Sequence, residues 1–293
     1  MPLSALALVV LAGLIHASWN IAAKKANGDV RFAFFIAFFT VIVWAPVGLY
    51  LGWQYLPQWS LSAWICVAAS GFIHVAYFIV LLRGYRKADL TVVYPLARGS
   101  GPLLSSAVAI AFFGEQLSLP GVAGIAGVAL GVFLIAGGPA IWRNTQMPEQ
   151  RARTRTGIAY GLLTGLTIAS YTVIDGYSVK ALLLPPMLMF YMSCVVQLVM
   201  LWPIALHDRP LARQHWKDQW KYALVVGAIS PVSYVMVLYA LQIAPLSHVA
   251  PAREVSMLFG AILGGHLLGE GNRAMRLTGA ACIGLGVAAL SWS

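Results

Sequence analysis

Ten apolar segments, each long enough to cross a lipid bilayer, follow one another along this chain. About 20 apolar residues span the hydrocarbon core. The segments cover residues 3–24, 31–51, 62–83, 91–113, 119–137, 156–178, 185–206, 219–243, 247–269 and 274–292. Backbone amides find no water inside a bilayer, so unbroken runs of this kind are satisfied as helices. The sequence therefore predicts an all-α integral membrane protein with ten transmembrane helices.

Composition agrees with a membrane protein and argues against a soluble one. Hydrophobic residues make up 60% of the chain and charged residues only 10%, against about 25% charged in soluble domains. The net charge of +10 has no soluble basic face to occupy, so we expect the lipid bilayer and no nucleic acid as a partner. Cys66, Cys194 and Cys282 fall inside apolar segments without metal-binding spacing, and we expect neither a metal nor a cofactor.

The chain contains an internal repeat. Shifted by 155 positions, residues 97–132 align with 252–287 without a gap, and ten of the 36 positions are identical. The matches include the Ala-Arg pairs ending at Arg98 and Arg253. We expect a first five-helix repeat over 1–140, a basic linker over 141–155 and a second five-helix repeat over 156–293. Five helices is an odd number, so the second copy enters the membrane inverted, with a central cavity between the copies.

Basic residues are concentrated in alternate loops. The loops after odd-numbered segments hold 16 of the 19 lysines and arginines, and the remaining loops and the ends hold only Lys180. Cytoplasmic loops carry the excess of basic residues in membrane proteins. This bias predicts a multi-pass protein of the bacterial inner (plasma) membrane, with both termini outside the cytoplasm.

Arg98 and Arg253 are the two basic residues that lie deep within apolar segments rather than at their ends. An intramembrane arginine costs several kcal/mol on insertion scales, and it usually faces a cavity or a partner. Each lies about seven residues into its segment, which is roughly 10 Å deep at 1.5 Å per residue. The pair lines a polar central site in one interpretation. In the other, the side chains reach the interface or form structural ion pairs.

Further polar and aromatic side chains share faces of several segments. His16, Trp19 and Asn20 stand at i, i+3 and i+4 of the first segment. A histidine satisfied by hydrogen bonds between helices is the alternative to a binding role. The predicted substrate-binding residues are Arg98, Arg253, Tyr94, His16, Trp19, Asn20, His74, Tyr77, Tyr171, Tyr234 and Ser256.

Two intramembrane carboxylates, Glu254 and Asp175, are candidates for proton coupling or for ion pairs. Glu254 follows Arg253 directly, and the sequence leaves open whether it neutralises that arginine and leaves Arg98 free. Asp175 is alternatively a helix-end residue near the outer interface. Glu115 and Glu270 fall in turns, where we expect each to cap the following helix.

The pieces HASWN (16–20), YPLARGSGPLL (94–104) with FFGE (112–115), and APAREVSMLFGAILGGHLLGE (250–270) resemble the drug/metabolite transporter superfamily of the EamA type. Within it, the chain resembles members associated with phosphonate utilisation. The resemblance implies helices 1–4 and 6–9 around a central cavity, with helices 5 and 10 outside. It also implies secondary transport of small metabolites.

No enzyme signature is present: the sequence lacks a phosphate-binding P-loop, and Ser100 lies in no serine-protease pattern. We therefore expect no enzyme. The leading hypothesis is a secondary transporter, a permease or exporter, for a small polar metabolite. The substrate is expected to be anionic or zwitterionic, like an amino acid or a phosphonate, and to move by alternating access through a monomer or homodimer. A non-transporting membrane scaffold or assembly partner is the alternative.

Overall fold

The computed structural model describes residues 1–26, 28–88, 90–135, 138, 148–260 and 273–292. Within these ranges the ordered elements are helices and no strand occurs. Helices satisfy their own backbone hydrogen bonds, which is what an apolar surrounding requires.

In its described residues, the first half contains six helices and one turn of 3-10 helix. They are α1 (Leu3–Ala26), α2 (Val30–Val43), α3 (Ala45–Tyr55), η1 (Leu56–Gln58), α4 (Leu61–Lys87), α5 (Leu90–Phe113) and α6 (Leu119–Ile135). Side chains cap three of the starts: Asp29 accepts from the amide of Arg31, Ser60 from that of Ala63, and Ser118 from that of Gly121. Such caps satisfy amides that have no partner within the helix.

The second half contains α8 (Pro148–Lys180), α9 (Pro186–Ala205), α10 (Arg209–Ile243), α11 (Leu246–Ala252) and α13 (Arg273–Ser291). Two helices begin earlier than the apolar segments predict. The basic stretch 148–155 is the start of α8 rather than linker, and α10 begins ten residues before position 219, where Asp208 caps it. Charged residues extend both helices beyond the apolar core.

Membrane-spanning helices are fewer in the described residues than the ten segments predict. Six helices are long and apolar enough to cross a membrane, or seven if α2 and α3 form one span with a 68° bend. The bend falls at Trp44, with Pro46 in the first turn of α3. α6 is shorter than a full span, and residues 261–269 of the predicted segment 247–269 lie outside the described residues. The count of ten therefore stays a prediction.

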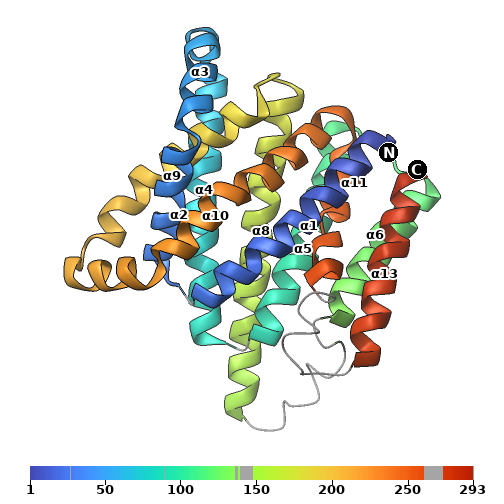
Figure 1. Cartoon of the computed structure of the whole chain (residues 1–293). Coiled ribbons are helices and arrows are strands. Elements are labelled where there is room, and N and C mark those ends of the chain that lie inside the picture. Colours follow the sequence, from blue (N-terminus) through green and yellow to red (C-terminus); the bar gives the residue numbers. More distant parts are fainter. Residues whose placement is uncertain (27, 89, 136–137, 139–147, 261–272, 293) are drawn as a thin grey trace.

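The two halves pack with two-fold related contacts (Figure 1). α1 packs against α10, and the equivalent pair from the other half, α8 and α4, is also in contact. α6 and α13 pack against each other at one side of the molecule, as expected for helices 5 and 10.

Glycines at the crossing of α6 and α13 show the same symmetry. A Cβ on Gly124 would lie 2.7 Å from the Gly286 carbonyl oxygen, and a Cβ on Gly286 would lie 2.7 Å from that of Gly124. Gly131 and Gly279 are related in the same way, at 2.5 and 2.8 Å. Adding the repeat shift of 155 to 124 and 131 gives 279 and 286. The Gly124–Gly286 contact and the Gly131–Gly279 contact are therefore equivalent under the repeat. The repeat in the sequence is thus a repeat in space.

The chain ends and the basic helix ends lie on opposite sides. α1 and α8 run in opposite directions, and the two termini lie together (Figure 1), with the Met1 amino group 3.2 Å from the Ser291 carbonyl oxygen. At the far side, the Lys87 ammonium lies over the Tyr160 ring at 5.9 Å, which joins the end of α4 to the beginning of α8.

Candidate functional site

The helix that carries Arg253 is broken at that residue, although the sequence predicts one continuous span. α11 ends at Ala252, Arg253 and Glu254 form a turn, and helical conformation resumes over 255–260. Pro251 has no amide hydrogen, so the Ser247 carbonyl loses its helical donor. The Ser106 hydroxyl of α5 donates to this carbonyl at 3.2 Å. Broken helices are tolerated inside membranes where the freed groups find such partners.

A glycine of α1 allows that helix to approach the break closely. A Cβ on Gly13 would lie 2.5 Å from Val255 Cγ1 and 3.2 Å from the Ser256 amide nitrogen. In the other half, a Cβ on Gly165 would lie 3.1 Å from the amide nitrogen of Gly101. Gly165 follows Gly13 by 152 residues and occupies the corresponding place in the first helix of the second half, so the first helix of each half packs against the fourth helix of the other half.

Arg98 of α5 is held by the broken segment of the other half. Its Nε lies 2.9 Å from Glu254 Oε2 in an ion pair, and its Nη2 donates to Ser256 Oγ at 3.0 Å. The Arg98–Glu254 contact is a close approach of charges rather than an aligned hydrogen bond. Both side chains are largely buried, with 14% and 5% exposure.

This pairing answers the question that the sequence left open, because Glu254 is paired with Arg98 and not with Arg253. Adjacent residues on a helix do not face each other, and the turn at the break directs the Glu254 carboxylate to Arg98 instead. Arg253 donates through Nη1 to Thr172 Oγ1 at 3.4 Å, and its guanidinium lies 5.4 Å from the centre of the Tyr234 ring. Within the described ranges Arg253 has no carboxylate partner. Of the two arginines, Arg253 is therefore the one without a counterion in the described part of the chain.

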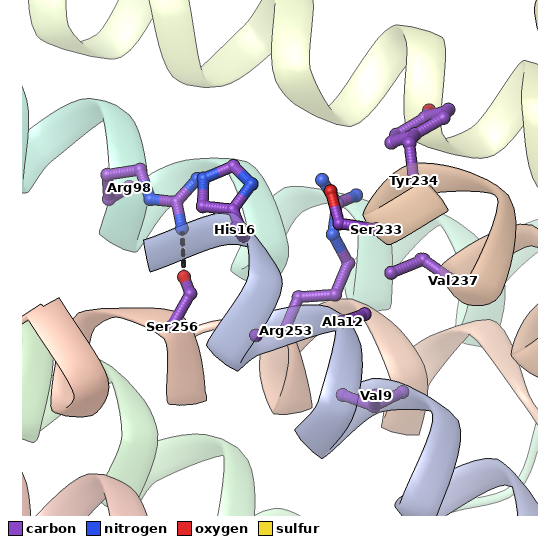
Figure 2. Close-up of a pocket in the computed structure, with 10 residues that line it drawn as sticks. Val9, Ala12, His16, Arg98, Ser233, Tyr234, Val237, Arg253 and Ser256 are labelled. Carbon is purple, nitrogen blue, oxygen red and sulfur yellow. Dashed lines mark hydrogen bonds between the residues drawn. The ribbon is translucent and has the colours of Figure 1, made fainter. Parts of the chain in front are cut away.

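Both arginines line one pocket, and Figure 2 shows His16 of α1 between their side chains. The pocket has an empty volume of about 310 Å³, which includes space open to solvent. Its lining comprises Val9, Ala12, Gly13, His16, Arg98, Ser233, Tyr234, Val237, Arg253 and Ser256. Helices from both halves therefore contribute to a narrow, positively charged pocket.

A second cluster lies behind Tyr234 and contains Asp175. The Tyr234 hydroxyl donates to Asp175 Oδ2. His74 of α4 stacks on Tyr171 with ring centres 4.0 Å apart, and Tyr77 approaches the same ring at 5.9 Å. Asp175 is only 1% exposed, which contradicts a place at an exposed helix end.

The sequence-predicted residues divide by position. His16, Arg98, Tyr234, Arg253 and Ser256 line the pocket. Trp19 is joined to the pocket because its indole donates to Ser233 Oγ at 3.2 Å. The Asp175 cluster takes in Tyr171, His74 and Tyr77.

Two predicted residues, Tyr94 and Asn20, do not line the pocket, and Tyr94 is 36% exposed. Sequence reasoning did not single out Thr172 or Ser106, which hold Arg253 and the broken helix. For Thr172 the available signal was its place three residues before Asp175, on one helix face. Within the described ranges no three His, Cys, Asp or Glu side chains are placed to hold a metal ion.

Glu115 caps a helix, but not the one expected. Its carboxylate accepts from the amides of Leu246 and Ser247, both at 2.9 Å, at the start of α11 rather than of α6. Lys180 Nζ lies 3.7 Å from the same carboxylate. Burial alone would raise the pKa of Glu115, but the hydrogen bonds from Ser247 and Leu246, together with Lys180, outweigh it and lower the pKa. Glu270 lies outside the described residues.

Comparison with known proteins identifies the family. The model of the EamA-like transporter family matches residues 3–137 and again 155–292. The chain belongs to this family. The two matches cover both halves, so the chain is a membrane protein of the drug/metabolite transporter superfamily with two EamA repeats. EamA is a family of transporters rather than of enzymes.

A solved crystal structure shares the fold, with a TM-score of 0.71 and 14% identity over 98% of each chain. At this identity the likeness shows the fold alone. Comparison with curated proteins gives no match.

Proposed function

We propose that this EamA protein is a secondary transporter of a small anionic or zwitterionic metabolite, and that Arg98 and Arg253 hold its anionic group. The observation that carries the proposal is the convergence of the two guanidinium groups, one from each half, on a single pocket. Guanidinium groups bind carboxylates and phosphonates in paired, charge-assisted hydrogen bonds. Amino acids and phosphonates are therefore the substrate classes to examine first.

The hydrogen-bond and ion-pair partners of the two arginines suggest a different role for each in anion binding. Arg253 is held by a hydroxyl and an aromatic face, so its positive charge is available to a ligand. Arg98 is paired with Glu254, and an anion that reaches it competes with that carboxylate. The ammonium group of a zwitterion would in turn be attracted to the Glu254 carboxylate that the anion displaces.

The two-fold related packing supports alternating access. In transporters with inverted repeats, the two halves exchange conformations around a site at their interface, so that the site opens to either side. Here the pocket lies between the halves, and the break at Arg253 supplies a joint within one of the helices that line it. Coupling to an ion gradient drives such transport.

For the membrane arrangement, we propose ten spans in the bacterial inner membrane with both termini outside the cytoplasm. The excess of basic residues in alternate loops supports this orientation. The proposal applies equally to a monomer and to a homodimer, because the pocket is built within one chain.

Ligand-dependent thermal stabilisation of the purified protein tests the proposal. The panel contains phosphonates, amino acids and organic cations, measured with the wild type, Arg253→Gln and the control Arg83→Gln, whose side chain is exposed on α4. We expect stabilisation by anions or zwitterions, which Arg253→Gln removes and Arg83→Gln retains. Stabilisation by cations alone would contradict the substrate class, and no stabilisation by any compound would favour a scaffold.

A further inference from the structure

The two arginines and two carboxylates of the site are not paired symmetrically. Arg98 and Glu254 form one ion pair. Arg253 and Asp175 remain, and within the described ranges they form no ion pair with each other. Tyr234 stands between them, with its ring under the Arg253 guanidinium and its hydroxyl on Asp175 Oδ2. One side chain therefore contacts both the free cation and the second carboxylate.

Asp175 is incompletely satisfied as a carboxylate. Oδ2 accepts from Tyr234, but the buried Oδ1 has no hydrogen-bond partner among the described residues. An ionised carboxylate accepts at both oxygens, whereas a protonated one can leave an oxygen with fewer partners. Removing an ionised carboxylate from water is costly unless it is paired and hydrogen-bonded. The burial of Asp175 and the missing partner at Oδ1 thus disfavour the ionised form of this carboxyl group.

Other groups also face Asp175. Tyr171 lies on its own helix, Ser70 and His74 face it from α4, Cys194 from α9, Tyr234 from α10, and Arg253 from the broken segment. Arg253 is the fixed charge of this set. The His74 Nδ1 atom lies 2.9 Å from the Ser70 carbonyl oxygen, to which it can donate as a neutral ring.

We propose that Asp175 is a proton-binding site linked through Tyr234 and Arg253 to the anion site, so that the anion and one proton bind together. The proposal rests on the transporter function proposed above. When an anion neutralises Arg253, Asp175 loses the positive charge that stabilises its ionised form, and Oδ1 takes up one proton. Linkage is reciprocal, so protonation of Asp175 strengthens anion binding at Arg253 by the same factor. The result is symport of one proton with the anion.

The test does not require the substrate. Infrared difference spectra of the purified protein in liposomes, recorded during a pH titration, report the carbonyl band of a protonated buried carboxyl group. We expect a titrating band in the wild type that Asp175→Asn removes. We expect the band to persist in Glu254→Gln. In Asp175→Glu the band should also persist, but at a changed frequency. If the band is unchanged in Asp175→Asn, or if His74→Gln rather than Asp175→Asn removes the titration, the proton site is elsewhere and the proposal fails.

Arg253→Gln imitates neutralisation by an anion, so it tests the link between the sites. Loss of a nearby positive charge disfavours the ionised carboxylate. We expect the midpoint of the Asp175 band to move to higher pH by about one unit. An unchanged midpoint would overturn the coupling. Because no ligand is involved, these outcomes do not depend on the compound panel, so failure of the proton site can be distinguished from failure of the proposed function.

Discussion

The carboxylate of Glu254 lies 2.9 Å from the guanidinium Nε of Arg98, across the boundary between the two repeats. The contact ties the broken helix of the second half to α5 of the first, close to the pocket between them. It also leaves Arg253, the neighbour of Glu254 in the chain, without an acidic partner among the described residues.

Glu254→Gln is expected to destabilise the protein, because Arg98 then remains as an unpaired buried charge. Breaking a buried pair by removing one partner costs about 3–5 kcal/mol. The double variant Arg98→Gln/Glu254→Gln removes both charges, so its loss should be much smaller than the sum of the two single losses. Unfolding of the four proteins in a double-mutant cycle measures the coupling. Additive losses would show that the ion pair contributes nothing.

Gly131→Ala is expected to weaken the packing of α6 on α13. The new Cβ would lie 2.5 Å from the Gly279 carbonyl oxygen, and a backbone atom in a helix cannot move away independently. Overpacking of this kind costs about 1–3 kcal/mol. Gly260→Ala is the matched control, because a Cβ there meets no atom of a described residue within 4 Å. Thermal unfolding should distinguish the two variants, and equal stability would contradict the close glycine crossing.

Glu115→Gln should reduce stability at neutral pH by about 1 kcal/mol, as the loss of a helix cap does. The pKa of Glu115 is lowered in the folded protein. Its contribution is therefore present above the ordinary pKa of a glutamate and is lost as the pH falls through the folded pKa. Melting temperatures of wild type and variant should converge in acid. The exposed Glu149→Gln serves as a control, and a difference independent of pH would contradict a role for the charged cap.

The two chain ends should give the same result in a topology assay. The Met1 amino group lies 3.2 Å from the Ser291 carbonyl oxygen, so both ends share one side of the membrane. Reporters that are active only in the cytoplasm should stay inactive at either terminus, because the basic loops are expected there. An active reporter at the C-terminus would reverse the orientation.

Sequence reasoning found the repeat and the arginine pair, because gap-free self-similarity and charges in apolar segments are visible in one dimension. It did not find the partner of Glu254, since Pro251 and the break at Arg253 change the direction of the side chain. The capping of α11 by Glu115 was missed for a related reason. Glu115 precedes Leu246, the first residue of α11, by 131 residues in the chain. The sequence around a glutamate in a turn does not show which helix it caps.

The Asp175 cluster was only partly predictable. Tyr171 and Asp175 are one turn apart on α8, which the helical period shows. That Tyr234 of α10 joins Asp175 to Arg253 depends on how three helices pack. Thr172, the hydrogen-bond partner of Arg253, shares a helix face with Asp175, but that position does not show that it contacts Arg253.

Counterflow in proteoliposomes, with an anion that stabilises the wild type, tests the two-arginine site most directly. Arg98→Ala and Arg253→Ala should each abolish exchange, while their membrane insertion and their elution in size-exclusion chromatography stay normal. The control Arg83→Ala should exchange like the wild type. If Arg98→Ala folds poorly, Arg98→Ala/Glu254→Gln removes the unpaired carboxylate and keeps the test intact. Full exchange by a correctly folded Arg98 or Arg253 variant would contradict the proposed anion site.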